Sequence, residues 1–235
     1  MQKETTTENA LMERMFEAGA HFGLSRSRRH PSAKSVIFGV KNGIEIIDLE
    51  KTTSHLAEAK EFVGTLSRTG KKLLFVGTKS EGRNAVMEGA LSIDMPYVHN
   101  RWLGGTLSNF PQIKKRILHM EDLITKRTGG LLDKYTKKER LLIDREIEKL
   151  EKNFAGLTVM KELPAALFVV DAKKEHIAVA EAKNMGIPVI SISSSDCDFS
   201  QIAYPIPAND ASKTSIAFFI KEITGAWKEG KTVTQ

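Results

Sequence analysis

Residues 165–171 read AALFVVD, and residues 72–77 read KLLFVG. Both stretches are almost continuously apolar and rich in β-branched and aromatic side chains, without the alternation of a strand that has one wet face. Continuous apolar runs of this length are typical of strands in a parallel sheet that is covered on both faces. These two stretches therefore predict the centre of an α/β sheet.

The segments around these two strands alternate between strand-like and helix-like patterns joined by short links. This alternation predicts βαβ units, and hence a doubly wound, mainly parallel sheet sandwiched by helices. Asn42-Gly43 between two apolar runs indicates a β-hairpin, and Asp48 is placed to cap the next helix. The other predicted strands are Val36–Val40, Ile44–Asp48, Pro96–Val98, Pro188–Ile192 and Ala203–Ile206, and the predicted helices are Leu49–Arg68, Thr78–Leu91, Lys174–Met185 and Asp210–Trp227, preceded by a helix with Leu11, Met15 and Gly19 on one face.

The alternation is interrupted once, between Phe110 and Gly156. Two apolar series at 4-3-4 spacing occur there, and Thr136 with Glu139 forms a capping box between them. This pattern predicts an antiparallel coiled-coil hairpin over residues 111–156, inserted into an α/β domain formed by residues 8–110 and 157–229. The two seams are Ile113, Ile117, Met120 and Ile124, and Ile143, Ile147, Leu150 and Phe154.

The composition favours a basic protein of a reducing compartment. The 235 residues include 35 Lys and Arg against 29 Asp and Glu, a formal charge of +6, which suits a partner rich in phosphates. A single cysteine, Cys197, allows no intrachain disulfide. The longest apolar run, Pro164–Val170, is too short to span a bilayer, and Met1–Glu8 has no apolar signal core. We therefore expect a cytoplasmic protein without membrane contact.

Two segments carry cations without nearby acids. Residues 23–34 read GLSRSRRHPSAK, and residues 97–110 read YVHNRWLGGTLSNF within an acid-free window from Met95 to Met120. The first can be a solvated loop and the second a turn in which Trp102 packs on the core, but their charge density favours an RNA contact, with Trp102 stacking on a base or anchoring its loop. The candidate RNA-binding residues are Arg26, Arg28, Arg29, His30, Lys34, Lys79, Arg83, His99, Asn100, Arg101, Trp102, Lys114, Lys115 and Arg116.

No catalytic constellation emerges from the sequence. Gly77–Arg83 (GTKSEGR) follows a strand but matches neither phosphate-loop motif, although Lys79 and Arg83 at a helix start would suit a phosphate group. This leaves a phosphosugar- or nucleotide-binding α/β enzyme as the alternative reading. The histidines lack zinc spacing, and loop aspartates such as Asp196, Asp198 and Asp210 more often cap turns than bind cations. We expect no catalytic residue, no metal and no cofactor.

A set of collinear motifs resembles the bacterial small-subunit ribosomal protein S2 family over about Met12–Trp227, nearly the whole chain. The motifs are Ala18–Gly23 (AGAHFG), Ile37–Gly39 (IFG), Ile46–Thr52 (IIDLEKT), Leu74–Lys79 (LFVGTK), Arg101–Thr106 (RWLGGT), Leu163–Asp171 (LPAALFVVD), Glu175–Ala178 (EHIA), Gly186–Val189 (GIPV) and Ile206–Asp210 (IPAND).

The resemblance implies a parallel α/β sandwich with a protruding coiled-coil hairpin and a structural, non-enzymatic role. It implies a place near the junction of the head and body of the small subunit, in contact with ribosomal RNA and neighbouring proteins, without a small-molecule substrate. In many bacteria the family helps to hold the large protein that recruits messenger RNA. The chain departs from the family pattern at Ser194–Asp196, where Asp-Thr-Asn is common, in the arginine content of Leu24–Lys34, and in its short tail after Trp227.

Overall fold

The computed structural model of the chain describes residues 2–132 and 134–232. Its centre is a five-stranded parallel sheet with the order β5-β4-β6-β7-β8. The three inner strands are buried along their whole length, as the continuous apolar sequences of residues 73–76 and 166–170 predict for two of them. The predicted α/β fold class is thereby confirmed. The strands are β4 (Leu73–Val76), β5 (Tyr97–Val98), β6 (Ala166–Val170), β7 (Val189–Ser193) and β8 (Tyr204–Pro207).

Each face of this sheet packs against its own apolar core, because successive side chains of a strand point to opposite faces. Phe75 and Phe168 belong to the core that the helices α1, α2, α3 and α7 cover. Leu74 and Leu167 belong to a second core, which α6 and the base of the hairpin cover. The covering helices are α1 (Gln2–Glu17), α2 (Leu49–Arg68), α3 (Arg83–Leu91), α6 (His176–Asn184) and α7 (Lys213–Thr232).

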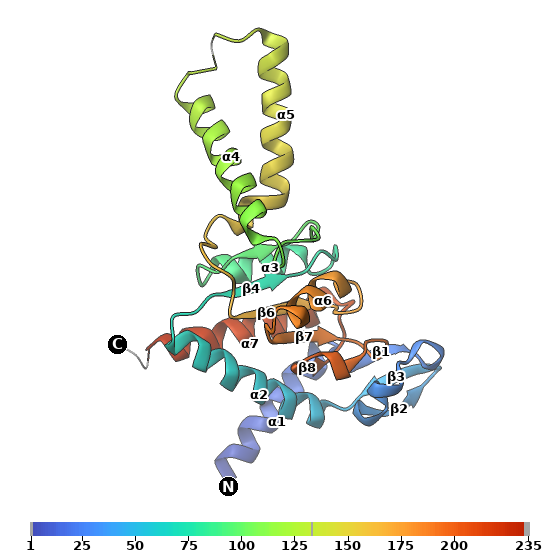
Figure 1. Cartoon of the computed structure of the whole chain (residues 1–235). Helices are drawn as coiled ribbons and strands as arrows, with labels where there is room; N and C mark the ends of the chain where they lie inside the picture. The colour runs from blue at the N-terminus through green and yellow to red at the C-terminus, as the bar shows by residue number, and fades with distance from the viewer. Residues whose placement is uncertain (1, 133, 233–235) are drawn as a thin grey trace.

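A second, three-stranded antiparallel sheet lies beside the large one, on the side away from the hairpin (Figure 1). The predicted hairpin turn is confirmed, with positive φ angles of 52° at Asn42 and 78° at Gly43. No pattern in the sequence indicates the edge strand β1. The strands are β1 (Phe22–Ser25), β2 (Ile37–Lys41) and β3 (Ile44–Ile47), and the short helices η1 (Arg26–Arg28) and η2 (Pro31–Val36) connect β1 to β2.

The helices α4 (Phe110–Thr128) and α5 (Lys137–Phe154) project together from the body as an antiparallel pair (Figure 1). The predicted capping box of Thr136 and Glu139 is present at the start of α5. After α5, the short helix η3 (Ala155–Leu157) returns the chain to the sheet. A Cβ at Gly156 would collide with the carbonyl oxygen of Tyr97, so glycine permits this close return to β5.

Several element boundaries differ from the prediction. The helix predicted over Thr78–Leu91 begins only at Arg83, because residues 78–82 form turns whose polar groups bond to other segments. The strand β3 ends at Ile47, one residue before the predicted end, and Asp48 caps α2 as predicted, since its Oδ1 accepts from the Glu50 amide at 3.1 Å. The last short helix is η4 (Phe199–Gln201). Among the described residues, no helix combines the length and apolar character needed to cross a membrane.

We predict that the buried seam, rather than helix propensity, stabilises the projecting pair. Ile147 is fully buried between α4 and α5, whereas Leu118 is 55% exposed. Replacing Ile147 with Ala should destabilise the hairpin by about 3 kcal/mol, because the substitution leaves a cavity. Leu118→Ala should change stability by less than about 0.5 kcal/mol. Amide hydrogen exchange in α4 and α5 measures both effects, and equal effects of the two substitutions would contradict the prediction.

Candidate nucleic-acid interface

The loop between β5 and α4, residues 99–109, is here called the tryptophan loop. Trp102 is only 6% exposed and belongs to the second core. Its indole Nε1 donates to Oε1 of Glu181 on α6 at 3.3 Å. Trp102 therefore anchors the loop to the body and is not presented for stacking on a base. Arg101, its neighbour, remains exposed.

The Glu181 carboxylate organises the tryptophan loop. Its Oε1 accepts from the Gly105 amide at 2.7 Å, and its Oε2 accepts from the Leu107 amide at 3.0 Å and the Ser108 amide at 3.3 Å. Burial raises the pKa of Glu181, but these amides and Trp102 outweigh burial and lower it below its usual value. The clamp therefore contributes fully above the ordinary carboxyl pKa and is lost only as the pH falls through the lowered value. Gly105 has a φ of 91°, which glycine adopts without strain.

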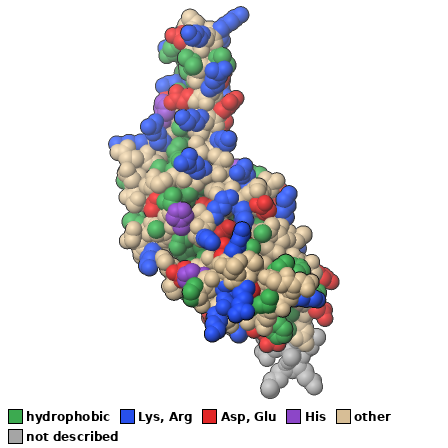
Figure 2. All heavy atoms as spheres, turned by 90° about the vertical axis from the view of Figure 1, so that its right-hand side faces the viewer, with side chains coloured by type: hydrophobic (Ala, Val, Ile, Leu, Met, Phe, Trp, Pro, Cys, Tyr) green, Lys and Arg blue, Asp and Glu red, His purple; other side chains and the backbone are tan. Residues whose placement is uncertain are grey.

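The segment 23–34, here called the basic loop, is bonded to the carboxyl edge of the large sheet. The His30 amide donates to the Ser195 carbonyl at 2.9 Å, and the Leu24 amide donates to Ser195 Oγ at 3.2 Å. Ser32 Oγ accepts from the Phe199 amide at 3.1 Å. These bonds hold the loop on the segment that follows β7. Arg26, Arg28 and Lys34 are exposed on it, and Figure 2 shows Lys and Arg side chains gathered on this side of the body and along the hairpin.

Two candidate residues of the basic loop have internal partners. Arg29 Nη1 lies 3.1 Å from Oε1 of Glu45, which is fully buried on β3, and Glu45 Oε2 has no partner among the described residues. Breaking such a pair leaves an uncompensated buried charge, so Arg29 is held in place. The His30 side chain caps η2 by accepting from the Ser32 amide at 3.3 Å. Both residues shape the loop.

The gap at the carboxyl ends of β4 and β6 is the point where doubly wound folds usually bind ligands. Here Lys79 Nζ lies 2.9 Å from Asp171 Oδ2 and 3.0 Å from Asp210 Oδ1. Burial and the neighbouring Asp171 raise the pKa of Asp210 to about 6, in spite of Lys79. Burial lowers the pKa of Lys79, but the two aspartates reverse this and raise it. The cluster holds two carboxylates for one cation, which disfavours a phosphate ligand.

The remaining candidates divide between internal and exposed positions. Arg83 Nη2 donates to the Thr78 carbonyl at 3.4 Å, and burial together with Arg83 lowers the pKa of His99. Asn100 Nδ2 donates to Asn153 Oδ1 at 3.2 Å, which ties the tryptophan loop to α5. The three hairpin candidates are exposed near the start of α4. They are Lys114, Lys115 and Arg116.

The three candidate metal-binding aspartates have separate partners. Asp196 pairs with Lys173 at 2.9 Å, Asp198 caps η4, and Asp210 pairs with Lys79. Within the described parts of the chain, no group of three His, Cys, Asp or Glu side chains is arranged to hold a metal ion. Lys173 is a cation that the sequence reasoning missed, although its position just after the central strand β6 was a usable signal.

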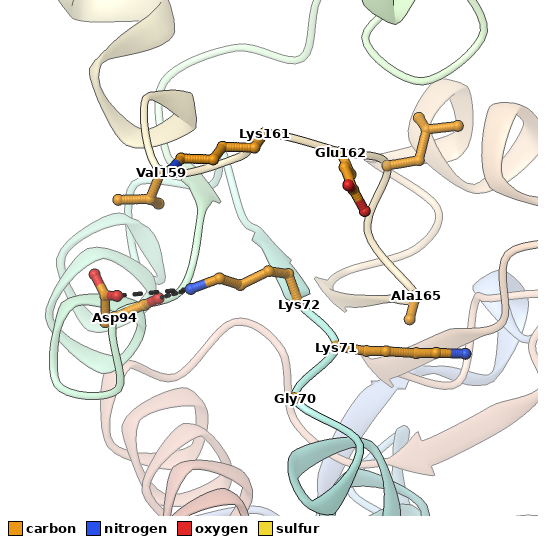
Figure 3. A pocket seen from close by; sticks show the side chains of 9 residues that line it. Gly70, Lys71, Lys72, Asp94, Val159, Lys161, Glu162 and Ala165 are labelled. Atoms are coloured by element: carbon orange, nitrogen blue, oxygen red, sulfur yellow. Dashed lines mark hydrogen bonds and ion pairs between the residues drawn. The ribbon is translucent and has the colours of Figure 1, made fainter.

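A cavity of about 720 Å³ lies at the opposite edge of the sheet, where β4 and β6 begin. Figure 3 shows the Lys72 ammonium pointing to Asp94, and Lys72 Nζ lies 3.6 Å from Asp94 Oδ2. Lys71 and Lys161, which also line the cavity, come from two different segments. Glu162 also lines this cavity, so its charges are mixed. This edge therefore serves as a natural control for the basic loop.

Comparison with known proteins assigns the family. The family model described as ribosomal protein S2 matches residues 15–230. The chain belongs to the ribosomal protein S2 family. This confirms the resemblance that the motifs indicate.

Similar proteins named small ribosomal subunit protein uS2 share 42–46% of their residues with this chain. The one from Sulfurimonas denitrificans is 46% identical over 222 residues, covering 94% of this chain and 86% of its own length. The one from Acidothermus cellulolyticus is 43% identical over 220 residues, covering 93% and 80%. The one from a Nitratiruptor species is 44% identical over 224 residues, covering 95% and 84%. The family is thus one of ribosomal proteins of the small subunit.

We predict that Lys79 is a structural cation of this S2-family chain. Lys79→Met should cost about 3–5 kcal/mol of stability at pH 7, because it leaves the buried Asp210 and the half-buried Asp171 without a cation. The loss should shrink as the pH falls towards 5: Lys79 lowers the pKa of Asp210, so its removal raises that pKa further, and protonation then stabilises the folded variant more than the folded parent. Urea denaturation of the variant and its parent at each pH measures the difference.

Lys72→Met is the matched control, because the Lys72–Asp94 pair is largely exposed. It should cost less than about 1 kcal/mol and show little dependence on pH. Equal losses in the two variants at pH 7 would show that the Lys79 cluster contributes no more than a surface ion pair.

Proposed function

We propose that this chain is a structural component of the cytoplasmic small ribosomal subunit that binds ribosomal RNA through exposed cations on fixed loops. The observation that carries this proposal is the basic loop, whose backbone is bonded to the carboxyl edge of the sheet while Arg26, Arg28 and Lys34 stay exposed. A loop that is already ordered loses little entropy on binding. Its guanidinium groups suit phosphate oxygens.

The internal ion pairs narrow the candidate set. We propose that the phosphate contacts come from the exposed cations, which extend from the basic loop across Arg101 to the start of α4. The candidates with internal partners position these contacts instead of making them. The first group is Arg26, Arg28, Lys34, Arg101, Lys114, Lys115 and Arg116, and the second is Arg29, His30, Lys79, Arg83, His99, Asn100 and Trp102.

We propose that neighbouring ribosomal proteins dock on the aromatic surface formed by α1 and the small sheet. Phe38 is 80% exposed and Phe16 is 61% exposed, and the His21 ring lies between Phe16 and Phe22 at centroid distances of 4.3 and 4.1 Å. Exposed apolar surface of this kind usually marks a protein contact. The family resemblance implies that one neighbour is the large protein that recruits messenger RNA. We propose that such a protein docks on this surface. The projecting hairpin, residues 111–156, would contact a further partner. Residues 8–110 and 157–229 would form the α/β domain that carries the hairpin.

No geometric feature favours the alternative of a phosphosugar- or nucleotide-binding enzyme. The carboxylates of Asp171 and Asp210 lie where the phosphate of such a ligand would bind, and Lys79 is neutralised by them. Thr78 and its amide are bonded to Glu175, which adds a third acid at this edge. We therefore propose a binding role without turnover.

The double variant Arg26→Glu/Arg28→Glu tests the RNA proposal. At salt concentrations from 50 to 200 mM, we expect the variant to bind small-subunit ribosomal RNA at least tenfold more weakly than the parent does. We also expect the slope of log affinity against log salt to fall by about 1.8, because about 0.9 is lost for each phosphate contact. Filter binding and co-sedimentation with small subunits measure the two effects.

Lys71→Glu/Lys161→Glu makes the same change of charge at the opposite edge of the sheet and should leave the salt slope unchanged. An equal loss in both variants would mean that net charge, and not the basic loop, sets the affinity. Full incorporation of Arg26→Glu/Arg28→Glu into subunits, with parental affinity, would contradict the proposal.

A further inference from the structure

We propose that a pocket beside the basic loop receives one unstacked nucleobase of RNA. This inference rests on the proposed function and specifies what the surface recognises besides phosphates. The pocket lies at the carboxyl ends of β6 and β7 and has a volume of about 290 Å³. Ligand pockets usually span about 300–1,000 Å³, so this one suits a single planar ring better than a protein segment.

The floor of the pocket is apolar and rigid. Ala172, Val179, Cys197 and Ile202 line it, and each is at most 7% exposed. Burial raises the pKa of the Cys197 thiol to about 11, so this side chain is a neutral surface and not a nucleophile. A dry floor of this kind favours the face or edge of a base over a hydrated phosphate.

Two histidines stand at the sides of the pocket. His30 comes from the basic loop, and Ser32 Oγ fixes its ring by a hydrogen bond of 2.8 Å to Nδ1. His176 is the first residue of α6 and is exposed. Histidine rings are among the side chains on which unpaired RNA bases stack. The pocket thus offers ring surfaces from two elements that are far apart in sequence.

Two carboxylates, Asp196 and Asp198, line the pocket together with the ammonium group of Lys173, which is paired with Asp196. Asp196 Oδ2 accepts a hydrogen bond from Lys173 Nζ at 2.9 Å, so Asp196 Oδ1 remains to accept from a donor on the ligand. Asp198 is ionised, since its bonds to Ser200 and Gln201 lower its pKa to about 2. Both oxygens of Asp198 already accept from Ser200 and Gln201, so Asp196 Oδ1 is the acceptor for amino and imino N–H groups, which nucleobases carry on their Watson–Crick edges. The ligand that fits is therefore the base of a nucleotide and not its phosphate.

Cations at the pocket and on the basic loop can bind the phosphate backbone of the RNA on either side of the inserted base. Lys173 lines the pocket and pairs with Asp196 at 2.9 Å, and Arg28 is exposed on the basic loop that also carries His30. Exposed Arg28 on the basic loop can bind the phosphates on either side of an inserted base, while the carboxylates keep those phosphates outside. This arrangement favours a nucleotide within an RNA strand over a free nucleotide.

The test compares His176→Ala and Asp196→Asn with the control His119→Ala, an exposed histidine on the hairpin. We expect His176→Ala to bind small-subunit ribosomal RNA about 5- to 150-fold more weakly, the range for losing one stacked base. We expect Asp196→Asn to bind it about tenfold more weakly, because a charged hydrogen-bond acceptor is lost. The salt slope should not change, because no phosphate contact is lost. One unpaired nucleotide should become reactive to base-modifying reagents in both variants, and His119→Ala should match the parent.

Parental affinity and unchanged base reactivity in both pocket variants would overturn the inference, even where Arg26→Glu/Arg28→Glu weakens binding. A parent chain that binds no ribosomal RNA would instead overturn the proposed function. In a separate arm, nucleoside monophosphates are titrated into the isolated chain while the imidazole signals of His30 and His176 are followed by NMR. Micromolar binding there, without any nucleotide protected in the RNA, would assign the pocket to free nucleotides and contradict the inference.

Discussion

The carboxylate of Glu181 is the constraint on which the arrangement of the outer parts depends. It receives the amides of Gly105, Leu107 and Ser108 together with the indole of Trp102, from a loop about 76 residues earlier in the chain. Because that loop leads directly into α4, the same contact sets where the projecting helices leave the body. Gly156 then lets the returning chain pass close to Tyr97, so the hairpin contacts the body of the protein at both of its ends.

The charged residues fall into two groups, those that form internal ion pairs and those that are exposed to solvent. Lys79 and Arg29 each neutralise carboxylates inside the molecule, at Asp171 and Asp210 and at Glu45. These pairs are strongly coupled to the fold, because removing one partner leaves a buried charge behind. The exposed arginines of the basic loop add little to stability and remain free to serve a ligand. Where a fold of this class usually binds nucleotides, at the carboxyl ends of β4 and β6, this chain has an internal ion-pair cluster instead.

Much of the fold could be predicted from local patterns. The continuous apolar runs of β4 and β6, the Asn42-Gly43 turn and the capping box at Thr136 each have a short-range cause, and each is present. The strand β1 was missed because four residues with mixed character carry no periodicity. The candidate site was less predictable, since the sequence identifies cations but not their partners. Whether Lys79 or Arg29 is free depends on contacts with Asp210 and Glu45, which only the folded chain brings together.

The most direct test of this account is the exchange rate of the Gly105 and Leu107 amide hydrogens in the parent and in Glu181→Gln. A glutamine has one acceptor oxygen in place of two and no charge, so it cannot hold both amides as the carboxylate does. The account predicts that both amides exchange at least tenfold faster in the variant, while Phe168 in β6 keeps its protection and the exposed control Glu229→Gln behaves as the parent. Unchanged rates at Gly105 and Leu107 would show that the tryptophan loop holds its shape without Glu181, and would contradict the account.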